Sequence, residues 1–166
     1  MSTPPLSSWP PSRPPEALRP DSARPPCSLT EFHLPHGGLV MSVPAARVLS
    51  YRVWGHLDGA ITDRLLELTE QRLATTERSL VGFHDCSELE SYDTSARLRM
   101  TSWVLERRDR CEAIHILSRS RLVSMGVAVA NMALGRFLVS YGPSDRDRFD
   151  AALQAAISAR APQGTA

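Results

Sequence analysis

Apolar and polar residues follow two different spacings after residue 28, and each spacing predicts one kind of secondary structure. Six short apolar or alternating runs are typical of β-strands, and four of them end directly before Gly or Pro. These runs occupy residues 28–34, 39–43, 48–54, 80–83, 113–117 and 137–141. The first two are joined by a Pro-His-Gly-Gly turn and predict a hairpin at the edge of a sheet.

Between these runs, apolar residues return every three or four positions, which indicates helices with one buried face. Such spacing predicts helices at 59–75, 93–110, 121–134 and 145–159. Asp58 and Asp93 stand at the expected starts of the first two, where a carboxylate accepts hydrogen bonds from free backbone N–H groups. The helix at 121–134 is apolar on nearly every side, so we expect it to be heavily buried or to meet a partner.

The alternation of strands and helices predicts an α/β domain over residues 28–160. Its central mixed sheet should have four to five strands, packed by about four α-helices. Residues 1–27 contain nine of the thirteen prolines, which predicts a disordered, extended tail without helix or central strand. Residues 161–166 should form a flexible C-terminal tail.

Composition narrows the classes of partner. The 166 residues carry a net charge of +1, which favours neither a nucleic acid nor a membrane surface. Three unevenly spaced cysteines do not form a disulfide framework, and no apolar run is long enough to span a bilayer. We therefore expect a cytoplasmic protein.

Charge is nevertheless uneven along the chain. Residues 97–121 hold seven arginines against three acidic residues. This excess indicates either a solvated helix face with weak local ion pairs or a docking patch for an acidic partner.

His84, Asp85 and Cys86 are the one adjacent group of reactive side chains in an expected core region. Neighbouring residues of a strand point to opposite faces, so His84 and Cys86 should share a side while Asp85 does not. No other His or carboxylate cluster has catalytic or metal-ligand spacing. We expect a protein that is not an enzyme and holds no cofactor or metal; a ligand or enzyme pocket around these three residues is the alternative.

Two motifs point to a known family. Residues 48–58, Val-Leu-Ser-Tyr-Arg-Val-Trp-Gly-His-Leu-Asp, resemble the strand–Gly–x–Leu–Asp opening of STAS domains, the fold of bacterial anti-sigma factor antagonists. Asp93-Thr94-Ser95-Ala96 resembles the Asp-Ser-Ser-Gly signature of that family. The resemblance covers roughly residues 28–160, where the elements also follow the family's order, and it implies a STAS-like fold.

The resemblance also implies a function. In the family, a partner kinase that is itself the anti-sigma factor phosphorylates the second hydroxyl residue of the signature. That role falls on Ser95, with Thr94 as the alternative, and a phosphate there would break the contact with the partner. The expected partner-binding residues are Asp58, Asp93, Thr94, Ser95 and Arg97.

The chain departs from the signature at Ala96, where the family usually has Gly. A partner that approaches the backbone closely at this position would meet an extra methyl group. The alternative function is therefore a STAS-like scaffold or oligomerisation module without a phospho-switch, with the helix at 121–134 as the interface between copies.

Overall fold

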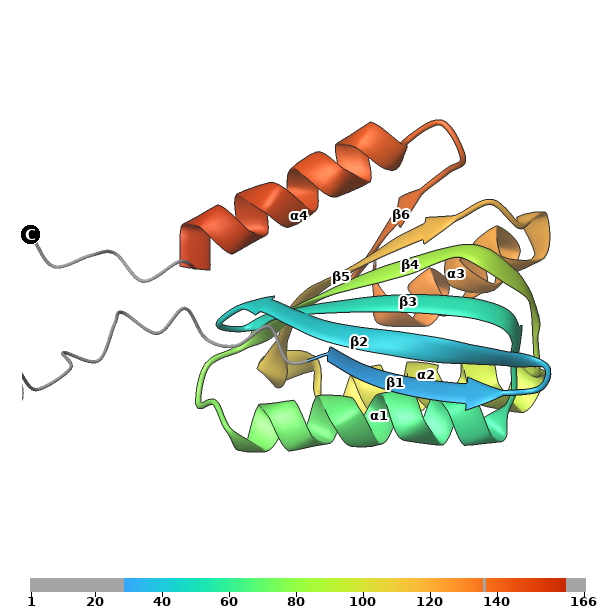
Figure 1. Ribbon diagram of the computed structural model, residues 1–166, viewed down its shortest axis with the longest axis horizontal. Helices are drawn as coiled ribbons and strands as arrows, with labels where there is room; N and C mark the ends of the chain where they lie inside the picture. The colour runs from blue at the N-terminus through green and yellow to red at the C-terminus, as the bar shows by residue number, and fades with distance from the viewer. Residues whose placement is uncertain (1–28, 136, 161–166) are drawn as a thin grey trace, which may run out of the picture.

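The computed structural model describes residues 29–135 and 137–160; the expected tails at 1–27 and 161–166 lie outside these residues. One six-stranded sheet runs through the molecule, with its strands in spatial order β1 to β6 (Figure 1). The elements are β1 (Leu29–Leu34), β2 (Gly37–Ala45), β3 (Val48–Leu57), α1 (Gly59–Ala74), β4 (Leu80–Tyr92), α2 (Thr94–Glu106), a short 3₁₀ helix (Arg108–Arg110), β5 (Cys111–Ser118), α3 (Arg121–Leu134), β6 (Leu138–Tyr141) and α4 (Arg146–Arg160).

The sheet is mixed, as expected of the α/β class. β1, β2 and β3 pair antiparallel, whereas β3 to β6 pair parallel. The strand number exceeds the expected four to five because both strands of the amino-terminal hairpin join the main sheet. β2 is long enough to pair with β3 from Gly37↔Gly55 to Ala45↔Val48.

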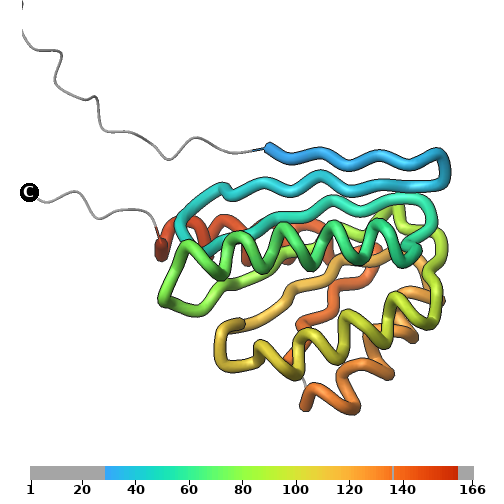
Figure 2. Tube along the Cα trace, turned by 90° about the horizontal axis from the view of Figure 1, so that it is seen from below, coloured from blue at the N-terminus to red at the C-terminus, as the bar shows by residue number. Residues whose placement is uncertain are grey.

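The helices cover the two faces of the sheet unequally. Each parallel strand is added on the same side of the preceding one, so right-handed crossovers place every connecting helix on one face. Figures 1 and 2 show α1, α2 and α3 side by side on that face and α4 on the other. The core therefore has two parts: one lies beneath α1 to α3, and a smaller one around Phe83, Leu117 and Phe149 lies beneath α4.

Two strands are longer than the sequence predicts. β3 continues through the expected turn to Leu57, with Gly55 at a φ of +71°. β4 runs from Leu80 to Tyr92, although only 80–83 reads as a strand. Its second half pairs with β3 but extends past β5, so this half is partly exposed. Its polar residues therefore have the composition of a loop.

The helix at 121–134 has the predicted bounds and meets both expectations in part. Val123, Val127, Ala130 and Leu134 point inward and are buried. The opposite face of α3 exposes a stripe of large apolar side chains: Leu122, Met125, Val129 and Met132. Gly135 ends the helix in the left-handed conformation that favours glycine.

None of the helices among residues 29–135 and 137–160 combines the length and the apolarity that a membrane span requires. Within the same residues, Cys86 and Cys111 are buried free thiols.

Candidate functional site

Two helix starts lie side by side at the carboxyl ends of β3 and β4. The strands are parallel and in register, with Leu57 opposite Tyr92, and the backbone N–H of Asp93 donates to the carbonyl of Leu57 at 2.9 Å. Asp58 follows β3 and precedes α1, just as Asp93 follows β4 and precedes α2. The sheet thus brings the two motifs of the sequence to one edge of the molecule.

Asp58 caps α1, as predicted. Its Oδ1 accepts a hydrogen bond from the N–H of Ile61 at 2.9 Å, and its Oδ2 lies 2.8 Å from Nε2 of His36. The backbone N–H of Ile61 lowers the pKa of the Asp58 carboxyl, and His36 lowers it further, against a smaller opposing effect of burial. The carboxylate is therefore held in its charged form by contacts within the domain.

Asp93 stands at the N-cap position of α2, but its side chain does not cap the helix, contrary to the prediction. Its Oδ1 instead lies 3.2 Å from Nε2 of His56, whose Nδ1 lies 2.8 Å from the hydroxyl of Ser91. The ring of His36 is 6.1 Å from that of His56. His36 and His56, which the sequence analysis did not assign to the site, therefore each contact one of its two carboxylates.

Thr94 and Ser95 occupy the first turn of α2, and both are exposed. Neither hydroxyl has a hydrogen-bond partner among residues 29–135 and 137–160. The first backbone bond of the helix runs from the N–H of Arg97 to the carbonyl of Asp93, which leaves the preceding N–H groups free. A negative group on Ser95 would therefore meet the positive end of the helix dipole.

Ala96 and Arg97 turn away from this exposed surface. Ala96 is 1% exposed and packs in the core, because it begins the inner stripe of α2. Its methyl group points inward, so the expected obstacle to a close partner does not lie on the surface. Arg97 is half-buried on the side that faces α3, and no ion pair joins it to another described residue.

Tyr92, the residue before Asp93, links this edge of the sheet to α3. The hydroxyl of Tyr92 donates to the carbonyl of Leu122 at 3.3 Å. A Cβ atom at Gly126 would lie 2.5 Å from that hydroxyl oxygen. Any larger residue at this position would therefore displace the side chain of Tyr92.

The arginines of residues 97–121 were expected to form either local ion pairs on a solvated face or a docking patch for an acidic partner, and each expectation fits some of them. Arg99 pairs with Asp63, and Arg107 lies 3.0 Å from Glu70, in exposed or half-exposed pairs that contribute little stability. Among the described residues, no ion pair involves Arg119 or Arg121. Arg119 precedes α3 and Arg121 is its first residue. Both follow the end of β5, at the same edge of the sheet as Asp58 and Asp93.

The group at 84–86 divides between the two faces of the sheet, as predicted. His84 and Cys86 face α2, whereas Asp85 faces α4 and lies 2.8 Å from Arg146. Burial raises the pKa of the Cys86 thiol to about 12, so the thiol is not a ready nucleophile. Within the described part of the chain, no three His, Cys, Asp or Glu residues are placed to hold a metal ion.

No model of a known protein family matches the sequence, and no curated protein is significantly similar to it. Among solved structures, the fold is similar to that of an uncharacterised protein of the DUF3478 family with a SpoIIAA-like fold from Shewanella loihica PV-4. The identity is 17%, the TM-score is 0.49, and the match covers 75% of this chain and 91% of that one.

The fold is also similar to that of an anti-sigma factor antagonist from Mycobacterium paratuberculosis. Here the identity is 15%, the TM-score is 0.49, and the match covers 78% of this chain and 97% of that one. Both likenesses concern the fold alone, at low sequence identity.

Proposed function

We propose that this protein is a STAS-type signalling module that binds another protein at the edge formed by Asp58, Asp93, Thr94, Ser95 and Arg97. Ser95 is the phospho-switch, with Thr94 as the alternative acceptor, and the partner is an anti-sigma factor serine kinase. One observation carries the proposal: two exposed hydroxyls without partners in the described chain stand at the start of a helix, beside two helix-leading carboxylates.

The switch rests on charge. A phosphate on Ser95 adds roughly 1.5 to 2 negative charges at neutral pH. The free N–H groups of the first turn of α2 stabilise such a charge, so the domain stays folded. The same charge adds to those of Asp58 and Asp93 on the surface that the partner covers, and it weakens binding unless the partner supplies cations.

Co-incubation of the full chain with candidate switch kinases and ATP, followed by mass spectrometry, tests the acceptor. We expect phosphate on Ser95 in the wild type and none there in Ser95→Ala. In pull-downs with the same kinases, Ser95→Ala should retain binding and Ser95→Asp should lose it. Ser102, an exposed residue two turns further along α2, provides the matched control, because Ser102→Asp should bind like the wild type.

Two results contradict the proposal. A kinase that binds tightly yet leaves both Ser95 and Thr94 unmodified excludes the switch. Equal loss of binding in Ser95→Asp and Ser102→Asp excludes a specific role for the first turn of α2.

A second function is favoured by the exposed face of α3. Met125 and Met132 are 67% and 86% exposed, in line with Leu122 and Val129 on one side of the helix. Such a stripe suits an interface between two copies of the chain, as in a scaffold without a switch. Light scattering of the wild type and of Met125→Glu over a range of concentrations tests it. A monomer at every concentration excludes this function.

A further inference from the structure

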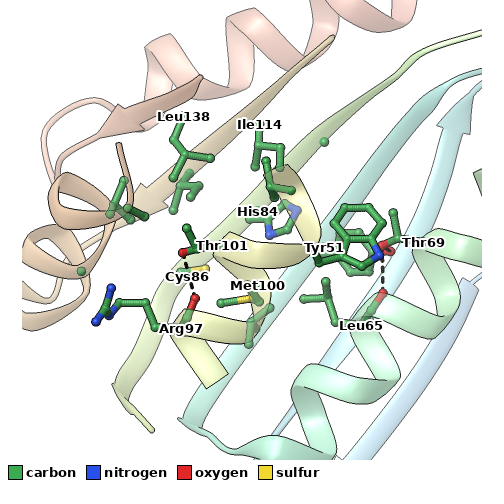
Figure 3. A pocket seen from close by; sticks show the side chains of 18 of the residues that line it. Tyr51, Leu65, Thr69, His84, Cys86, Arg97, Met100, Thr101, Ile114 and Leu138 are labelled. Atoms are coloured by element: carbon green, nitrogen blue, oxygen red, sulfur yellow. Dashed lines mark hydrogen bonds between the residues drawn. The ribbon is translucent and has the colours of Figure 1, made fainter. Parts of the chain in front are cut away.

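A cavity of about 130 Å³ lies between the sheet and the helices α2 and α3 (Figure 3). It exists because α2 packs loosely: Ala96 and Val104 are the buried residues of that helix, and a glycine, Gly82, occupies the facing strand. The wall is mainly apolar, with Leu49, Ile114 and Leu134 among its residues. An engineered apolar cavity of about 150 Å³ in another protein binds benzene, so this one suits a ligand of similar size.

His84 of β4 is a polar residue of the cavity wall that has no hydrogen-bond partner among the described residues. Figure 3 shows its ring among the lining side chains, with no dashed line reaching it. No hydrogen bond joins it to any residue of 29–135 or 137–160, and its half-buried ring lines the cavity. Burial lowers the pKa of His84 to about 4, so the ring is neutral at pH 7. Its ring nitrogens remain accessible, so they are free to form a hydrogen bond with a molecule in the cavity.

Most other polar side chains of the wall are already hydrogen-bonded, whereas the guanidinium of Arg97 has no ion pair among the described residues. The hydroxyl of Tyr51 lies 2.7 Å from that of Thr69, which donates in turn to the carbonyl of Leu65 at 2.8 Å. The hydroxyl of Thr101 donates to the carbonyl of Arg97 at 2.9 Å. The imidazole of His84 therefore offers a neutral directional contact for a molecule in the cavity.

We propose that the cavity binds a compact, neutral molecule, an aromatic ring or a short hydrocarbon chain with a single hydroxyl group, and that this hydroxyl forms a hydrogen bond with His84. A neutral imidazole has one donor and one acceptor nitrogen, so it suits a hydroxyl. A carboxylate is disfavoured in the interior, because Arg97, the one cationic side chain of the wall, is half-buried at its rim and the rest of the wall offers no charge to repay desolvation. Arg97 and Thr101 of α2 line the cavity and are half-buried, so the wall reaches the surface beside them.

Phenol, toluene and benzoate are matched probes of this site, because they share a ring and differ in the polar group. We titrate each into the full-length protein and follow binding by isothermal calorimetry and by the NMR signals of the His84 ring. Phenol should bind saturably below about 10 mM and should shift the His84 signals. Toluene should bind more weakly without that shift, and benzoate should not bind.

Two variants separate the roles of the polar contact and the space. His84→Leu should weaken phenol about tenfold, which corresponds to ~1.4 kcal/mol, and should change toluene less than about threefold. Ala130→Leu places a larger side chain in the cavity wall and should abolish binding of both probes, while near-UV circular dichroism confirms that the variant is folded.

Three results overturn the inference. The first is an absence of saturable binding of phenol and toluene to the wild type. The second is benzoate binding more tightly than phenol, which would place an anion site at the rim beside Arg97. The third is an equal phenol affinity of the wild type and His84→Leu. The titrations of the wild type decide the matter even if a variant fails to fold. All of them are independent of the proposed switch at Ser95.

Discussion

The most direct test of the interior is to replace His84 by Leu and compare stability at two pH values. The pKa of His84 falls from 6.5 to about 4 on folding, because burial disfavours the charged ring. Below pH 6.5 the unfolded chain therefore binds a proton that the folded chain does not. Stability is unaffected by this residue above pH 6.5, decreases as the pH falls toward 4, and stays lowered below that.

The size of the effect follows from the same difference. Each pH unit below 6.5 costs about 1.4 kcal/mol, so His84 removes ~2 kcal/mol at pH 5 and roughly 3 kcal/mol by pH 4. Single domains are stable by only about 5–15 kcal/mol, so this loss is substantial. Leu carries no titrating group, and it also ends the cost of an unpartnered polar ring, so the variant should be at least as stable as the wild type at pH 7.5.

Urea unfolding at pH 7.5 and pH 5.0, followed by tryptophan fluorescence, measures the difference. Between the two pH values, the wild-type midpoint should fall by about 1 M urea more than that of His84→Leu. His33→Gln controls for the loss of an exposed imidazole and should behave like the wild type. If wild type and His84→Leu lose equal stability on acidification, His84 is not an enclosed neutral ring and the reasoning is wrong.

The remaining predictions concern the caps, the α4 side and one turn. Asp58→Ala should cost about 1 kcal/mol in thermal unfolding and Asp93→Ala clearly less, because the first carboxylate caps its helix and the second does not; equal losses would contradict this. Since folding lowers the pKa of Asp58, its contribution is present above the ordinary carboxyl pKa and disappears as the pH falls through the folded value. Burial raises the pKa of Asp85, but Arg146 and Ser87 lower it more, so Asp85→Ala should cost about 1–3 kcal/mol at pH 7 in urea unfolding, and an unchanged midpoint would exclude a structural ion pair. Gly55→Ala should lose about 1–3 kcal/mol at its positive φ, whereas Gly59→Ala, in open space, should not destabilise.

Much of the fold could be predicted because local spacing determines it. The bounds of α3 follow from apolar residues in helical spacing and a terminal glycine, and the α/β class follows from the order of elements. The second half of β4 could not be predicted in this way. Its polar residues are accommodated because β4 extends past β5, which is a property of the assembled sheet and not of the local sequence.

The candidate site, like the fold, could be predicted from the sequence only in part. The positions of Asp58 and Asp93 before helices could be read from the sequence, but the fate of the Asp93 side chain could not. His56 reaches Asp93 only because β3 and β4 pair in a particular register, across a separation of 37 residues. A residue pattern records which groups are present, whereas such contacts depend on how distant segments are aligned.

The helix α4 stands alone on its face of the sheet, and Phe149 is the one fully buried side chain it contributes. Its other apolar residues, Ala152, Leu153, Ala156 and Ile157, are only partly buried. A helix with one fully buried side chain opens more readily than the rest of a domain, and its amide protons exchange earlier with solvent. Transient detachment of this helix would uncover the ring of Phe83 while the opposite layer, with the first turn of α2, keeps its arrangement. Among residues 29–135 and 137–160, proteolysis of the native protein should therefore begin in α4 and spare the surface that a partner would bind.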